Sequence, residues 1–161
     1  MKRNQYQMVS EFLNYWKNYM IQSILATVAI FIVLLVLSLE HAVVIASIGA
    51  SAFVVFAMPN NVSSRPRSLI GGQLVGLLVG SIFGLFMFDS SIGQMLAYSF
   101  AVGTSIFLMV VLDMEHPPAA GTALGVAITG FSNEVALALI TSSIILSLIH
   151  QLFKPYLRDL V

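Results

Sequence analysis

The sequence predicts an all-α membrane protein that crosses the bilayer several times. Of its 161 residues, 58% are hydrophobic and only 9% are charged, whereas soluble domains are about 25% charged. The apolar residues fall into six runs, and a membrane-spanning helix needs roughly 20 mostly apolar residues. Seven Lys and Arg balance seven Asp and Glu, which excludes the basic surface of a nucleic-acid-binding protein. The sequence has no Cys, which excludes disulfides and Cys-ligated metal sites.

Residues 1–20 are predicted to form an amphipathic helix at the membrane interface, ahead of a single transmembrane domain over 21–161. Apolar and aromatic side chains recur there at helical spacing, as is typical of a helix that lies in the interface plane. They are Met8, Phe12, Tyr15 and Tyr19, with Trp16 as a further aromatic anchor.

The six apolar runs are the expected membrane segments. In chain order they are Ile21–Leu39, Ala42–Met58, Leu69–Phe88, Gly93–Leu112, Pro117–Phe131 and Val135–Phe153. The second and fifth runs correspond to helices of about 25 and 22 Å, which is short for a hydrocarbon core of about 30 Å. These two runs therefore either cross as short segments or enter and leave the membrane on the same side.

The basic residues favour six crossings. They cluster in three places, which are Lys2, Arg3 and Lys17, then Arg65 and Arg67, then Lys154 and Arg158. If all six runs cross, the three clusters share one side, and the positive-inside rule assigns it to the cytoplasm, together with both termini. Two re-entrant segments would place Arg65 and Arg67 outside. We therefore expect a multi-pass protein, of a prokaryotic inner membrane, with both termini cytoplasmic.

A weak internal repeat relates the two halves of the chain. Glu40-His41 precedes the second run just as Glu115-His116 precedes the fifth, and the same offset aligns Ser47 with Thr122. Two inverted three-segment repeats, over 21–88 and 93–153, are a recurring design of secondary transporters. Chance identity in so apolar a composition is the alternative.

A stripe of glycines marks the third run. Gly72, Gly76, Gly80 and Gly84 follow one another at intervals of four, which leaves one helix face without side chains and lets another helix approach closely. The stripe is expected to be either an internal helix contact or the seam of a homo-oligomer.

The stretch from Asp113 to Thr122 carries the most chemical information. Pro117 and Pro118 favour a helix start, so the following backbone N–H groups lack partners in their own helix. Such groups, with the positive end of the helix dipole, form an anion site. The expected site comprises His116, Pro117, Pro118, Ala119, Ala120, Gly121 and Thr122, completed by His41 and Ser47 of the matching half. The alternatives are that Glu115 and His116 pair with each other, or that they simply mark a solvated loop.

Charged residues near this stretch are candidates for coupling or gating. Glu40, Asp113 and Glu115 would accept protons, or would raise the pKa of a neighbouring histidine. Arg65 and Arg67 would attract an anion to the inner mouth, or would only satisfy the positive-inside rule. The expected partners are a small inorganic anion and the lipid bilayer.

No catalytic or metal-binding motif is present. The sequence has no Gly-x-Ser-x-Gly elbow, no phosphate-binding loop and no paired His spacing for a metal. We therefore expect no enzyme activity, no metal and no cofactor.

Several of these motifs together resemble the HPP family of integral membrane proteins. The matching stretches are Ile48–Ala52, Val55–Pro59, Arg65-Pro66-Arg67 with Gly71-Gly72, and His116-Pro117-Pro118 continuing to Leu124. The resemblance covers about residues 20–155. It implies a membrane protein, usually described with four transmembrane helices, and some photosynthetic members are associated with nitrite transport.

The sequence departs from the family pattern at a few positions. Arg65 stands where the family often has Gln, Gln73 stands where it has His, and Ala120-Gly121 is inverted. Gln73 puts in doubt any proton transfer through that family histidine. The resemblance favours transport of a small anion, nitrite first, and the alternative is a non-transporting membrane scaffold or sensor subunit.

Overall fold

The computed structural model describes residues 5–36, 42–86 and 88–161, and within them the chain is helical, with no strand. Its helices are α1 (Gln5–Val36), α2 (Ala42–Ala57), α3 (Pro66–Gly84), α4 (Ser91–Val111), α5 (Pro117–Thr129) and α6 (Asn133–Phe153). Two short 3₁₀ turns, η1 (Val62–Ser64) and η2 (Lys154–Tyr156), follow α2 and α6. The prediction of an all-α protein with six apolar segments is confirmed.

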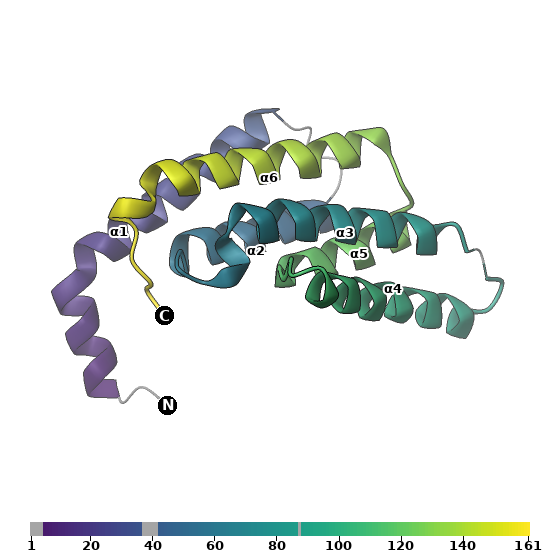
Figure 1. Cartoon of the computed structure of the whole chain (residues 1–161), viewed down its shortest axis with the longest axis horizontal. Helices are drawn as coiled ribbons and strands as arrows, with labels where there is room; N and C mark the ends of the chain where they lie inside the picture. The colour runs from purple at the N-terminus through teal and green to yellow at the C-terminus, as the bar shows by residue number, and fades with distance from the viewer. Residues whose placement is uncertain (1–4, 37–41, 87) are drawn as a thin grey trace.

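The first helix differs from its predicted division at residue 20. α1 continues past that position, and its irregular residue is Tyr15, with φ −124° and ψ 17°. The bend separates an N-terminal arm from the rest of the helix (Figure 1). The Arg158 guanidinium lies 3.6 Å from the centre of the Tyr15 ring. The C-terminal segment therefore contacts α1 at its bend.

The third helix starts and ends earlier than its apolar run. Pro66 is its first residue, where a fixed φ suits the first turn and the missing N–H costs nothing. It ends at Gly84 instead of Phe88. Hydropathy alone misses both ends, because the first turn is polar and apolar residues continue into the α3–α4 connection.

Four helices are long enough to span a membrane, and two are short. The four candidate spans are Leu13–Val33, Pro66–Gly84, Ser91–Val111 and Asn133–Tyr156. α2 has 16 residues and α5 has 13, or about 24 and 20 Å at about 1.5 Å per residue. The shortness predicted for the second and fifth segments is confirmed.

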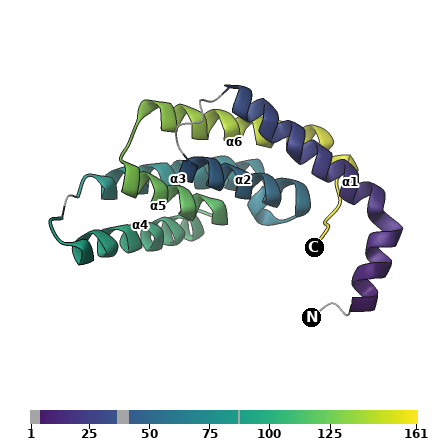
Figure 2. The same ribbon diagram turned by 180° about the vertical axis from the view of Figure 1, so that it is seen from behind.

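The chain reverses direction from each helix to the next, and its two ends lie at the same end of the bundle (Figures 1 and 2). The Leu160 N–H donates to the Ala57 carbonyl over 2.9 Å, and the Asn60 N–H donates to Asp159 Oδ1 over 3.0 Å. The α2–α3 connection, which carries Arg65, therefore lies against the C-terminal segment. The six-crossing arrangement expects this placement of Arg65, and the number of crossings stays a prediction.

The glycine stripe is an internal seam between α3 and α5. A Cβ added at Gly72 would lie 2.6 Å from the His116 Cβ, and one added at Gly80 would lie 2.6 Å from the Ala123 carbonyl oxygen. One added at Gly76 would meet the Ala119 carbonyl oxygen. The backbones approach so closely because α3 presents no side chain along this face. The expectation of an internal contact holds, and α5 occupies the surface that a homo-oligomer seam would need.

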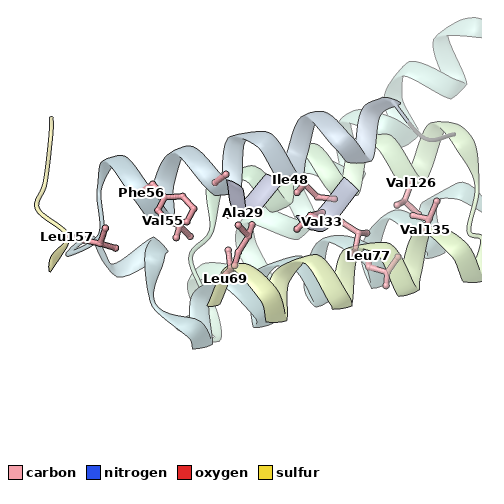
Figure 3. Packing of buried hydrophobic residues seen from close by; sticks show 13 residues of the cluster. Ala29, Val33, Ile48, Val55, Phe56, Leu69, Leu77, Val126, Val135 and Leu157 are labelled. Carbon is pink, nitrogen blue, oxygen red and sulfur yellow. The ribbon is translucent and has the colours of Figure 1, made fainter. Parts of the chain in front are cut away.

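Buried apolar side chains join the helices around this seam. One cluster draws on α1, α2, α3, α5 and α6 (Figure 3) and includes Ala29, Val55, Leu69, Val126 and Leu139. A second cluster, with Val75, Ala101 and Ala119, joins α3, α4 and α5. The short helices are thus enclosed between longer ones, which carries their polar residues into the interior.

The packed helix pairs have a two-fold pattern. If α1, α2 and α3 correspond to α4, α5 and α6, each contact of one half has a counterpart in the other. The α1–α2 contact corresponds to α4–α5, and α1–α6 corresponds to α4–α3. The α2–α6 contact corresponds to α5–α3. The pairs α2–α5 and α3–α6 complete the set. Exchanging the first three helices with the last three leaves this set unchanged, which is the packing that the predicted repeat requires. The limits of the repeat, 21–88 and 93–153, stay a prediction.

Candidate functional site

The His-Pro-Pro turn forms the start of α5, as the sequence predicts. His116 is the N-cap residue in extended conformation (φ −139°, ψ 93°), and Pro117 is the first helical residue. The His116 side chain is completely buried. Buried polar groups need partners to offset their lost hydration, so the contacts of this ring define the site.

The two ring nitrogens of His116 contact two different elements. Nε2 lies 2.8 Å from the Ser51 hydroxyl oxygen on α2, and Nδ1 lies 2.8 Å from the Ser63 carbonyl oxygen in η1. The Ser63 carbonyl can only accept a hydrogen bond, so Nδ1 carries the hydrogen. In the neutral ring Nε2 is then an acceptor, and the Ser51 hydroxyl donates to it.

Gln73 of α3 links this contact to a second one between α2 and α5. Its amide nitrogen donates to the Ser51 hydroxyl over 3.0 Å and to the Ser47 hydroxyl over 3.3 Å. Its amide oxygen accepts from the Thr122 hydroxyl over 2.6 Å. All four of these side chains are buried. Gln73 is thus the centre of a polar network, defined here as Ser47, Ser51, Gln73, His116 and Thr122.

The two short helices meet directly in this network. The hydroxyl oxygens of Ser47 and Thr122 are 2.7 Å apart, and the Ser47 hydroxyl also reaches the Pro118 carbonyl oxygen over 2.7 Å. Ser47 and Thr122 are the residues that the predicted repeat aligns, 75 positions apart in the chain. Corresponding residues touch each other only where a two-fold axis passes between them, so this contact supports the repeat.

The network holds no charged side chain, and its groups satisfy one another. Hydroxyl, amide and imidazole groups offer several donors together with the start of α5, whose dipole favours an anion. A ligand that enters must exchange its own hydrogen bonds for the internal ones. The arrangement is therefore suited to a small species with a few acceptor oxygens, held between α2, α3 and α5.

The structure divides the predicted site residues into an inner and an outer set. Pro118, Ala119 and Thr122 are buried toward the network, and Ala120 is half-buried. Pro117 and Gly121 are exposed, and a Cβ added at Gly121 would have no heavy atom within 4 Å. These two lie on the outer face because a helix turns about 100° per residue. Their prediction as site residues is not supported by this placement.

The charged candidates lie at the rim. Arg67 Nη1 is 3.5 Å from an Asp113 carboxylate oxygen, and Nη2 donates to the Leu112 carbonyl over 2.9 Å. Arg65 is exposed at the same end. Asp113 is in the left-handed region with φ 56°, so the α4–α5 connection turns sharply here. These residues fasten the connection to the start of α3.

Glu115 is the charged residue next to the network. It is half-buried, and its Oε2 atom is buried with no hydrogen-bond partner among the described residues. The structure thus does not show the alternative Glu115–His116 pair, because both His116 ring nitrogens contact other groups. Glu40 and His41 lie outside the described residues.

Two members of the network were not among the predicted site residues. Ser51 lies one helical turn after Ser47, so the two hydroxyls share a face of α2, and this spacing is a readable signal. Gln73 stands out as a polar residue within an apolar run, and polar residues inside the membrane are costly and often functional. Their meeting with His116 depends on how three helices pack, which the sequence does not show.

A family comparison agrees with these features. The model for the HPP transmembrane region matches residues 13–157. The chain belongs to the HPP transmembrane family. The match covers all six helices from Leu13 onward, and it includes every member of the polar network.

Curated relatives of this HPP family chain include two transmembrane proteins of Dictyostelium discoideum. One is 34% identical over 88 residues, covering 55% of this chain and 31% of the relative. The other is 33% identical over 103 residues, covering 58% of this chain and 33% of the relative. This chain therefore matches about a third of the length of each. No solved structure matches.

Proposed function

We propose that this HPP protein moves a small monovalent anion, nitrite first, across the membrane. The observation that carries the proposal is the buried polar network where the two short helices meet α3. Uncharged donors at the start of a helix suit an anion of low charge. Family membership supports a membrane role, and the association of some HPP members with nitrite transport favours this substrate.

Transporters with two related halves offer a precedent for a substrate site at this network. Such proteins bind substrate near the middle of the membrane, between the repeats, at helices that do not span its full width. α2 and α5 are the short helices here, and Ser47 and Thr122 join them. The basic end of the bundle, with Arg65, faces the cytoplasm in this proposal.

The scaffold alternative has lost the surface that favoured it. It used the glycine stripe as an interface with another protein, and α5 of the same chain covers that stripe.

The test is nitrite uptake by the purified full chain in liposomes. Ser51→Ala removes a hydroxyl from the network and is expected to lower the uptake rate strongly. Ser99→Ala is the matched control, because Ser99 is exposed on α4 and its hydroxyl bonds within its own helix, to the Met95 carbonyl over 2.8 Å. Equal uptake by the two variants, or no wild-type uptake above protein-free liposomes, contradicts the proposal.

A further inference from the structure

We propose that His116 is the proton-binding group of the transport cycle, so that each small anion crosses together with one proton. The inference rests on the proposed function and adds the co-transported ion to it. Its basis is the hydrogen-bond pattern around the ring, which is complete with or without the added proton.

An anion that enters the network alone would be an uncompensated buried charge. Removing an ion from water without a partner costs several kcal/mol. Of the five network side chains, the His116 imidazole alone can become a cation by taking up a proton, since hydroxyl and amide groups do not. A proton taken up on this ring supplies the positive charge that the other members lack.

The neutral ring already has its acceptor atom turned toward a hydroxyl. Nδ1 holds its hydrogen against the Ser63 carbonyl, which leaves the lone pair of Nε2 facing Ser51 at 2.8 Å. The Ser51 hydroxyl has a second acceptor in reach, the Ser47 carbonyl oxygen at 3.0 Å. One hydroxyl hydrogen therefore has two alternative acceptors.

Protonation of the His116 ring at Nε2 moves the hydrogen of the Ser51 hydroxyl to its second acceptor and breaks no other hydrogen bond of the network. Nε2 gains the proton and donates to the Ser51 oxygen, while the Ser51 hydroxyl rotates to the Ser47 carbonyl. Gln73 donates to the same Ser51 oxygen over 3.0 Å in both states. Release of the proton from Nε2 reverses the rotation, so one proton enters and one proton leaves in each cycle.

The His116 ring is completely buried, and burial disfavours its charged form, so the ring is neutral while the network is empty. The groups that face it from the packed elements are uncharged: the Ser51 hydroxyl of α2, the Ser63 carbonyl of η1 and the backbone at Gly72 of α3. Glu115 adjoins it in the chain, with Oε2 buried and unpartnered among the described residues. The opposite charge that stabilises the protonated ring is therefore that of the anion itself, once it enters the network.

Other charged or titratable groups near this end have separate contacts. The Asp113 carboxylate pairs with Arg67 at the surface, and Arg65 is exposed. His150 of α6 is buried, with its Nε2 placed 3.0 Å from the Pro59 carbonyl oxygen. Among the described residues, Glu115 is thus the ionisable residue next to His116 in the sequence.

The experiment records nitrite entry and proton entry together. Liposomes containing the full chain enclose a pH-sensitive dye, their membrane potential is clamped, and protein-free liposomes give the passive entry of nitrous acid. Wild type is expected to admit one proton per nitrite, and an acidic outer solution accelerates entry. His116→Gln, which cannot titrate, is expected to reduce nitrite-linked proton entry to the protein-free level.

A second pair of variants tests the hydroxyl. Ser51→Thr retains the rotating hydroxyl and is expected to keep one proton per nitrite, while Ser51→Ala is expected to lose this ratio. This pair gives the answer if His116→Gln does not fold.

The outcomes separate the two proposals. Wild-type nitrite entry without proton entry overturns the role of His116 and leaves anion transport standing. An unchanged ratio of protons to nitrite in Ser51→Ala overturns it as well. If the wild type admits no nitrite above protein-free liposomes, the proposed function fails, and the proton-coupled cycle fails with it.

Discussion

At the scale of single residues, the Thr122 hydroxyl is the point where all three inner helices meet. It donates to Gln73 of α3 from α5 and lies 2.7 Å from the Ser47 hydroxyl of α2. Removing one partner from a buried network leaves the others without hydrogen bonds, at a cost of about 1–3 kcal/mol. A residue in this position affects both stability and any ligand bound among the three helices.

Replacing Thr122 by Val keeps the shape of the side chain and removes its hydroxyl. We expect this variant to unfold at a lower temperature and to lose most nitrite uptake, because the Gln73 oxygen is left unpaired. Thr122→Ser keeps the hydroxyl and is the control that retains uptake. Thermal unfolding in detergent and liposome uptake are the measurements, and wild-type behaviour of Thr122→Val would contradict the assigned role.

Several residues of the site could be predicted from the sequence. Which of them face the polar network could not be predicted. The start of α5 at Pro117 follows from the backbone of proline, and Ser47 and Thr122 follow from the repeat. From the sequence we expected Gly121 in the site together with its neighbours, whereas the rotation of the helix turns it outward. Gln73 and Ser51 join His116 only through packing between distant segments, for which the sequence carries no local signal.

At the scale of helices, the α3–α5 seam fixes the position of the His-Pro-Pro turn. Gly72, Gly76 and Gly80 bring the backbone of α3 against α5 near His116, Ala119 and Ala123. A helix held this closely has one register, because any shift along the seam brings a side chain of α5 against the α3 backbone. The seam therefore sets the height of His116 relative to Gln73.

Substitution of Gly76 by Ala tests this close approach. The added Cβ meets the Ala119 carbonyl oxygen, and overpacking of this kind costs about 1–3 kcal/mol. Gly103→Ala on α4 is the matched control, since its Cβ would have no heavy atom within 4 Å. We expect a lower unfolding temperature for Gly76→Ala alone; equal values for the two variants would argue against the seam.

Helix positions were predictable where the apolar run and the helix coincide, as they do closely for α2, α4, α5 and α6. α3 and α1 differ because other forces set their ends. Pro66 starts α3 inside a polar segment, and the bend of α1 lies at Tyr15, where the C-terminal Arg158 packs. A contact between residues so far apart in the chain has no counterpart in local hydropathy.

At the scale of the whole molecule, positive charge gathers at one end of the bundle. The α2–α3 connection, which carries Arg65 and Arg67, lies against the C-terminal segment that carries Arg158. The connection between α3 and α4 lies at the far end of the bundle (Figure 1), and Asp89 belongs to this connection. From the positive-inside rule we predict that this basic end faces the cytoplasm.

Labelling of introduced cysteines tests this orientation, and the natural sequence has no Cys to interfere. Arg65 and Asp89 are both exposed. In intact cells, an impermeant thiol reagent is expected to label Asp89→Cys, and to label Arg65→Cys only after the membrane is opened. Labelling of both from outside would exclude the six-crossing arrangement. The reverse pattern would contradict six crossings with a cytoplasmic basic end, because two re-entrant segments, or an inverted bundle, place Arg65 outside and Asp89 inside.

The tight contact of α3 with α5 also determines where the protein can part. Two helices in backbone contact move as one body, since no side chain between them can rotate to absorb a displacement. The contacts of Ser47 and Ser51 with Gln73, His116 and Thr122 all join α2 to this body. If the protein transports an anion as proposed, we expect α2, which carries the two serines, to be the helix that separates from the α3–α5 pair to admit it.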